Sequence, residues 1–143
     1  MSQPIDAVLA KLAFADSEFT AGRARGYQDL YSHGDDVTIF GAFGGHERGW
    51  ASAGPRLAWA AAQFTPSTSG LERTVLSASF GADHGYTVSL EGSPHISTIA
   101  GTTDQSWLRV THVYRLEDGA WKIVHRHADP LVEKVPPGIT AST

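Results

Sequence analysis

Residues 108–129 read LRVTHVYRLEDGAWKIVHRHAD and predict a β-hairpin. Runs rich in β-branched and aromatic residues flank Glu117-Asp118-Gly119, a sequence typical of a tight turn. We interpret the turn as a three-residue loop in which Gly119 takes the left-handed conformation. This register sets Leu116 opposite Ala120 and Arg109 opposite His127.

The register also decides which side chains share a face, because side chains alternate along a strand. One face, which we expect to line the interior, carries Arg109, Thr111, Val113, Trp121, Ile123, His125, His127 and Asp129. The other face, which we expect to point outward, carries Val110, His112, Tyr114, Val124 and Arg126. A two-residue loop would instead bring His125 beside His112, because a slip of one residue reverses the faces.

The chain before this hairpin divides into a helical part and a strand part. Apolar residues at spacings of three and four predict helices over residues 4–19, 27–31 and 49–64, with a short strand at 37–43. After Pro66 the pattern changes to a period of two, which predicts strands at 73–80 and 86–91. Pro94 and Gly101 argue against an unbroken strand between residues 92 and 104. Helices followed by antiparallel strands predict an α+β fold.

The size and composition of the chain exclude several classes of function. Its 143 residues suit one domain, which we place at residues 1–131, followed by a flexible tail at 132–143. The chain has no cysteine, which excludes thiol nucleophiles, and its net charge of −4 argues against a nucleic-acid partner. There is no apolar run long enough to span a membrane and no targeting signal, so we expect a cytoplasmic protein.

Three stretches resemble the SnoaL-like branch of the nuclear transport factor 2 and ketosteroid isomerase superfamily. They are residues 35–41 (DDVTIFG), 108–115 (LRVTHVYR) and 121–129 (WKIVHRHAD), within a similarity that covers residues 5–131. The resemblance implies a cone-shaped α+β fold, in which a strongly curved antiparallel sheet wraps around three helices and leaves one central pocket. It also implies a homodimer that pairs through the outer face of the sheet.

The family includes isomerases, cyclases, hydrolases, dehydratases and non-catalytic modules, so the fold alone does not decide the chemistry. Ketosteroid isomerases carry a general-base aspartate near the position of Phe40-Gly41, where this chain has no carboxylate. Epoxide hydrolases of this fold use an Asp-Arg-Asp set. Arg109 and Asp129 could supply two members of that set, but Thr111 stands where the second carboxylate would be needed.

Four residues of the hairpin form the predicted catalytic site: His125, His127, Arg109 and Asp129. One histidine would transfer protons and Asp129 would orient it. Arg109 would favour the neutral imidazole or hold a substrate oxyanion. The alternative is a buried hydrogen-bonded network with a purely structural role.

We expect the rest of the pocket to be lined by Thr111, Tyr86, Trp59, Phe40 and Trp121. This mixture suits an apolar small-molecule ligand with one or two oxygens, and it needs no cofactor. We predict no metal, because His125, His127 and Asp129 would spread over roughly 13 Å of strand. Two functions therefore remain open: a cofactor-independent isomerase, cyclase or hydrolase, and a non-catalytic ligand-binding or dimeric assembly module.

Overall fold

The structure is a computed structural model that describes residues 4–65 and 70–138. The helices of this part of the chain are α1 (Pro4–Thr20), α2 (Arg25–Leu30) and α3 (Trp50–Ala61). Its strands are β1 (Thr38–Phe40), β2 (Glu47–Arg48), β3 (Glu72–Phe80), β4 (His84–Thr98), β5 (Gly101–Glu117) and β6 (Ala120–Pro130). The element order confirms the predicted α+β class.

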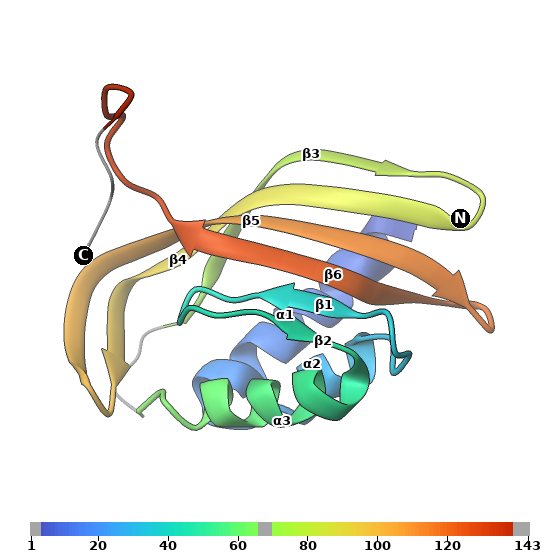
Figure 1. Cartoon of the computed structure of the whole chain (residues 1–143), viewed down its shortest axis with the longest axis horizontal. Helices are drawn as coiled ribbons and strands as arrows, with labels where there is room; N and C mark the ends of the chain where they lie inside the picture. Colours follow the sequence, from blue (N-terminus) through green and yellow to red (C-terminus); the bar gives the residue numbers. More distant parts are fainter. Residues whose placement is uncertain (1–3, 66–69, 139–143) are drawn as a thin grey trace.

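The strands form one curved sheet with the helices gathered on its concave side (Figure 1). The strand order is β2-β1-β6-β5-β4-β3, so β2 and β3 lie at the two edges and the sheet is not closed. The prediction of a wholly antiparallel sheet is wrong at one position. β1 leaves the helical layer alongside the last strand and in the same direction, so β1 and β6 pair in parallel.

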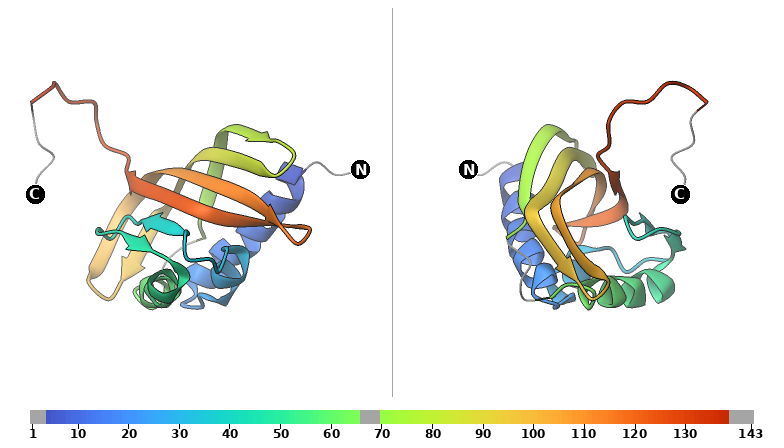
Figure 2. Two further views of the ribbon diagram at one scale, coloured as in Figure 1. Left: turned by 45° about the vertical axis from the view of Figure 1, so that its right-hand side comes forward. Right: turned by 90° about the vertical axis from the view of Figure 1, so that its left-hand side faces the viewer.

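The far end of the β4–β5 hairpin bends over toward the end of α3 (Figure 2). Main-chain hydrogen bonds hold it there, from Thr65 N to the Ser97 carbonyl and from Ile99 N to the Gln63 carbonyl, both at 2.8 Å. β4 continues through Pro94, contrary to our expectation. Pairing with β5 skips Pro94, which has no N–H, so the strand continues on both sides of it.

A core of apolar side chains joins the helices to the concave face of the sheet. Val8, Leu12 and Ala15 of α1 meet Tyr114 of β5 and Ile123 of β6, and all of them are buried. Beyond β6, residues 131–138 leave the sheet as an exposed segment (Figure 1). The predicted tail extends past this segment, and residues 139–143 lie outside the described residues.

The turn of the β5–β6 hairpin is shorter than predicted. Glu117 pairs with Ala120, which leaves a two-residue loop of Asp118 and Gly119 with φ values of 50° and 80°. A type I′ turn requires positive φ at both positions, and Asp-Gly is among the sequences that favour it. The predicted three-residue loop is therefore wrong.

A bulge at Val124 then shifts the register by one more residue. Arg109 pairs with Asp129 and Thr111 with His127, two positions from the prediction. The shorter loop and the bulge together shift the register by two residues, which is one full period of strand alternation. His125, His127 and Asp129 therefore still share a face with Arg109, as predicted. Trp121 and Ile123 precede the bulge and lie on the opposite face.

The predicted inside and outside of the hairpin are reversed in β5 and, from residue 125 onward, in β6, whereas Trp121 and Ile123 face the core as predicted. Tyr114 and His112 are fully buried against the helices, whereas Arg109 and His127 are exposed on the convex side. β4 shows the same reversal, since Thr87, Ser89 and Glu91 are buried and Tyr86 is 40% exposed. Strand alternation defines two faces but not which one meets the helices.

Candidate functional site

A cavity of about 270 Å³ lies between the helices and the concave face of the sheet. Its walls are mainly apolar and include Phe19, Ile39, Phe43, Leu57, Ala60, Phe64, Leu71, Ile96 and Leu108. Its inner end, which we call the floor, is polar and is formed by Asp16, Tyr27, Glu91 and Arg126. The volume is near the lower end of the range for small-molecule sites, about 300–1,000 Å³.

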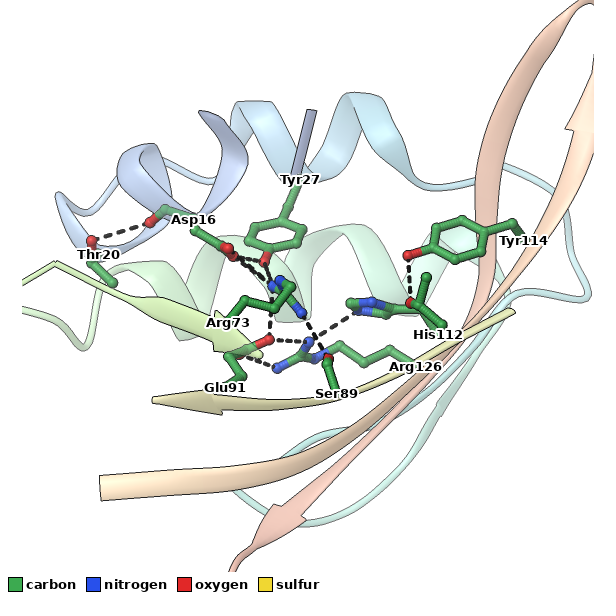
Figure 3. Close-up of polar contacts among 10 residues, drawn as sticks. Asp16, Thr20, Tyr27, Arg73, Ser89, Glu91, His112, Tyr114 and Arg126 are labelled. Atoms are coloured by element: carbon green, nitrogen blue, oxygen red, sulfur yellow. Dashed lines mark hydrogen bonds and ion pairs between the residues drawn. The ribbon is translucent and has the colours of Figure 1, made fainter. Parts of the chain in front are cut away.

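The floor belongs to a network of polar and charged side chains that joins α1 to four strands (Figure 3). Arg73 of β3 lies between two carboxylates, with Nη2 at 3.0 Å from Asp16 and 2.9 Å from Glu91. Arg126 of β6 binds the other side of Glu91, with Nη2 at 2.9 Å from Oε1. Nη1 of Arg126 also donates to Nε2 of His112, at 3.0 Å.

The two carboxyl groups of the network have opposite pKa shifts. Burial opposes the ionisation of Glu91, but the adjacent Arg126 and Arg73 outweigh it and lower the pKa of Glu91 to about 2. Burial raises the pKa of Asp16, and the nearby charge of Glu91 adds to the effect, against the attraction of Arg73. Asp16 is therefore the carboxyl group of this network that takes up a proton more readily.

Neutral groups complete the network. Tyr27 donates a hydrogen bond to Oδ1 of Asp16, and burial raises the pKa of Tyr27 well above its usual range. Burial, followed by Arg126 and Arg73, lowers the pKa of His112 well below its ordinary value. His112 is therefore a neutral imidazole that accepts at Nε2 and carries its proton on Nδ1.

Arg126 has donors to spare at the cavity. Its bonds to Glu91 and His112 use both hydrogens of Nη1 and one of Nη2. Nε and the second hydrogen of Nη2 have no partner among the described residues, and 15% of the side chain is exposed. These two N–H groups share one edge of the guanidinium, which is the geometry that binds a ligand oxygen or oxyanion.

The predicted catalytic residues do come together, but on the outer face of the sheet. Arg109 and Asp129 form a bidentate pair at 2.7 and 3.0 Å. His127 Nε2 is 3.7 Å from Asp129 Oδ2, and His125 Nδ1 is 2.7 Å from the hydroxyl of Thr38. Burial, followed by the charge of His127, lowers the pKa of His125. Arg109, Asp129, His125 and His127 do not line the cavity.

The predicted pocket residues are placed in three regions. Phe40, Tyr86 and Thr111 lie on the outer face, where Phe40 is in edge contact with the rings of both His125 and His127. Trp121 packs against Phe80 in the core, at 5.0 Å between ring centroids. Trp59 is 43% exposed beside the mouth of the cavity, and none of these five residues is part of its lining.

Sequence reasoning missed the floor of the cavity. One signal was available in α1, where Asp16 follows Val8 and Leu12 at helical spacing and so falls on the buried face. Glu91 also had a signal, because it continues the polar alternation of Thr87 and Ser89, and that alternating set is buried. Among the side chains that the structure describes, which do not include those of residues 102–106, no group of three His, Asp or Glu is arranged to hold a metal ion.

A family model described as a SnoaL-like domain matches residues 5–133. The chain belongs to the SnoaL-like domain family. The resemblance drawn from the three stretches of sequence is therefore confirmed. No curated protein matches the chain. In the described part of this SnoaL-like chain, no helix has the length and apolar character needed to cross a membrane.

Solved structures share the fold at low sequence identity. A nuclear transport factor 2-like superfamily protein from Salmonella enterica subsp. enterica serovar Typhimurium str. LT2 has a TM-score of 0.74 at 12% identity, covering 96% of this chain and 97% of that chain. A protein from Streptomyces avermitilis, provisionally named a dehydratase of the NTF2-like family, has a TM-score of 0.68 at 17% identity, with coverages of 89% and 94%.

A third structure comes from Thiobacillus denitrificans and is provisionally named a calcium/calmodulin-dependent protein kinase type II association domain. It has a TM-score of 0.67 at 22% identity, and the match covers 86% of this chain and 93% of that chain. At these identities the three structures establish the cone-shaped fold alone.

We expect Glu91→Gln to lower the free energy of unfolding by about 3–5 kcal/mol, because it leaves two buried arginines short of a counter-charge. The ionised form of Glu91 is favoured in the folded protein, so its contribution is present above pH 4.5 and is lost as the pH falls toward 2. The stability difference between Glu91→Gln and the unaltered protein should therefore shrink over that interval. Urea unfolding at a series of pH values measures it.

Asp129→Asn is the control for this variant, because it removes an acidic partner from an exposed pair with Arg109. We expect that change to cost less than about 1 kcal/mol. Equal losses in the two variants would contradict the view that the buried network is the more strongly coupled of the two.

Proposed function

We propose that the chain binds a small, largely apolar molecule with one or two oxygens in its cavity and acts on it by acid–base chemistry without a cofactor. The observation that carries this proposal is Asp16, a buried carboxyl group of raised pKa that shares Arg73 with Glu91 at the polar floor. The apolar walls suit the body of such a ligand, and the free edge of Arg126 suits its oxygen.

The roles of the floor residues follow from their hydrogen bonds. Arg126 would hold an oxygen of the ligand and stabilise negative charge as it develops there. Asp16, once deprotonated, would remove a proton from the ligand or from a water molecule beside it. Tyr27 fixes the orientation of the Asp16 carboxyl through its hydrogen bond to Oδ1. Isomerases, cyclases and hydrolases all need such a step.

Filling the cavity tests binding without altering its charges. Ala60 lines the cavity from α3, so we expect Ala60→Trp to weaken the binding of 2-naphthol at least about tenfold by occupying its space. Ala58→Trp is the matched control, because Ala58 lies on the same helix and is exposed. The fluorescence of 2-naphthol in a titration gives both affinities. Equal binding to the two variants would contradict the cavity as the ligand site.

Replacing Asp16 tests catalysis with 5-nitrobenzisoxazole, a bicyclic compound with an acidic ring C–H. A base takes that proton, the C–H electrons form the nitrile, and the ring N–O bond breaks with its electrons going to oxygen, so the ring opens to a cyanonitrophenolate. We expect Asp16→Asn to slow the reaction at least about a hundredfold, as for loss of a general base. With the unaltered protein the rate should rise with pH through the raised pKa of Asp16, because only the carboxylate accepts a proton. Absorbance of the phenolate follows the reaction.

Two sets of variants give the comparison. Asp29→Asn removes a carboxylate from an exposed pair with Arg25 and should leave the rate unchanged. His127→Ala and Arg109→Ala should also leave it unchanged, because those side chains lie on the outer face. A rate that falls in these two variants and persists in Asp16→Asn would place the chemistry on the outer face, and our proposal would be wrong.

A second function is favoured by the outer face itself, where exposed aromatic side chains lie near further apolar residues. Phe40 is 42% exposed and Tyr86 is 40% exposed, and Val88 and Val113 lie on the same face as Tyr86. We propose that this face pairs with a second copy of the chain, as an isologous interface in which the same patch meets itself. The pairing is compatible with a ligand in the cavity, which opens elsewhere.

Placing a charge on that face should separate the copies. We expect Tyr86→Glu to shift the protein from dimer to monomer in sedimentation velocity, because two like charges would then be buried near the symmetry axis. Phe14→Glu is the control, since Phe14 is 62% exposed but lies on α1, away from the outer face. A protein that is already monomeric at micromolar concentration would rule out this interface.

A further inference from the structure

The charged side chains that line the cavity are neutralised by one another, with a single exception. Asp16, Glu91 and Arg126 form the floor network with Arg73, in which two carboxyl groups face two arginines. Arg56 lines the same cavity but makes no ion pair or hydrogen bond with the described residues. It is therefore a permanent positive charge without a counter-charge from the described part of the protein.

Arg56 lies at the open end of the cavity. It belongs to α3, on the turn that also presents Leu57 and Ala60 to the cavity wall. Phe43, another lining residue, is 48% exposed, whereas the floor residue Glu91 is 4% exposed. Arg56 itself is partly exposed, so it stands with Phe43 at the mouth rather than at the floor.

The guanidinium of Arg56 is held in place by aromatic contacts. Its central carbon lies 3.9 Å from the centre of the Trp59 ring, in a cation–π contact. Trp59 in turn meets Phe43 at a right angle, with 5.5 Å between ring centroids. This contact does not use up the N–H donors of Arg56, none of which has a hydrogen-bond acceptor among the described residues. A planar, oriented fork of donors is the arrangement that binds a carboxylate through two hydrogen bonds.

The cavity therefore has a direction, from a floor of balanced charge through apolar walls to a cationic mouth. A ligand carboxylate at the floor would be repelled by the negative charge of Glu91 and by that of Asp16 when Asp16 is ionised. At the mouth, the same carboxylate would meet only the positive charge of Arg56. We infer that the ligand is an apolar carboxylic acid, bound with its carboxylate on Arg56 and a neutral oxygen at the floor. This inference rests on the proposed function, and it assigns to Arg56 the selection of acidic ligands.

Two fluorescent probes that differ by one carboxylate test the inference: 6-hydroxy-2-naphthoate and 2-naphthol. We expect the unaltered protein to bind 6-hydroxy-2-naphthoate about tenfold more tightly than 2-naphthol, as for a charge-assisted pair. Arg56→Gln should lower the affinity for 6-hydroxy-2-naphthoate to about that for 2-naphthol and so abolish the preference, and Arg56→Lys should retain part of it. Added salt should reduce the preference, because the mouth is open to solvent.

Arg48→Gln is the control for the change in net charge. Arg48 is exposed on β2, does not line the cavity, and forms no ion pair with the described residues, so its loss should leave the preference intact. Three outcomes would overturn the role of Arg56 without affecting the proposed function. The preference could persist in Arg56→Gln, it could be lost equally in Arg48→Gln, or it could be missing from the unaltered protein while 2-naphthol still binds. Failure of both probes to bind would overturn the proposed function, and this inference with it.

Discussion

The double ion pair of Glu91 is the interaction on which the rest of this structure depends. Arg73 and Arg126 reach the same carboxylate from β3 and β6, on either side of the strand that carries it. Arg73 also binds Asp16 and so ties the helical layer to the sheet. Buried charges cost several kcal/mol each to remove from water, and their mutual attraction recovers that cost only when the geometry is close to ideal. The network therefore fixes where α1 sits on the sheet more than it adds to stability.

The position of this network explains how polar and apolar surfaces meet in one cavity. A core filled only by apolar side chains would close over the concave face of the sheet, because every void forfeits contacts. Here the charges of the two carboxyl groups and the two arginines offset one another, and the aromatic and aliphatic residues above them line an open cavity instead of filling it. Asp16 is the least stabilised carboxylate of the network, because it shares Arg73 with Glu91 and because burial disfavours the charged form of Asp16. A group held in that balance changes its protonation state readily, which is what proton transfer requires.

Much of the fold could be predicted from the sequence, because the apolar period is 3.6 in α1 and α3 and 2 in the strands. The register of the last hairpin could not be predicted, because Asp118 and Gly119 suit more than one type of loop. The local sequence also contains no signal for the bulge at Val124. The shorter loop and the bulge each shift the register by one residue. Arg109, His125, His127 and Asp129 therefore share a face, as predicted, but that face is the outer one. The face that meets the helices could not be predicted either, because strand alternation defines two faces without deciding which of them is buried. In β4 the buried side chains are Thr87, Ser89 and Glu91, and the exposed one is Tyr86.

This reversal is itself informative, because folding alone disfavours it. A sheet that only needed to be stable would bury Tyr86 and Val88 and expose Glu91 to water, since unpaired polar groups are costly inside and apolar ones gain little outside. β4 does the opposite on both of its faces, and each of these two departures has its own reason. Polar groups on the concave side have a use if a ligand enters, and apolar groups on the convex side have a use if another surface covers them. The two departures share the same strands, so a single shift of register would reverse both faces at once. That coupling is a strong constraint on β4 and β5, and it makes the alternation of these strands a functional feature as well as a structural one.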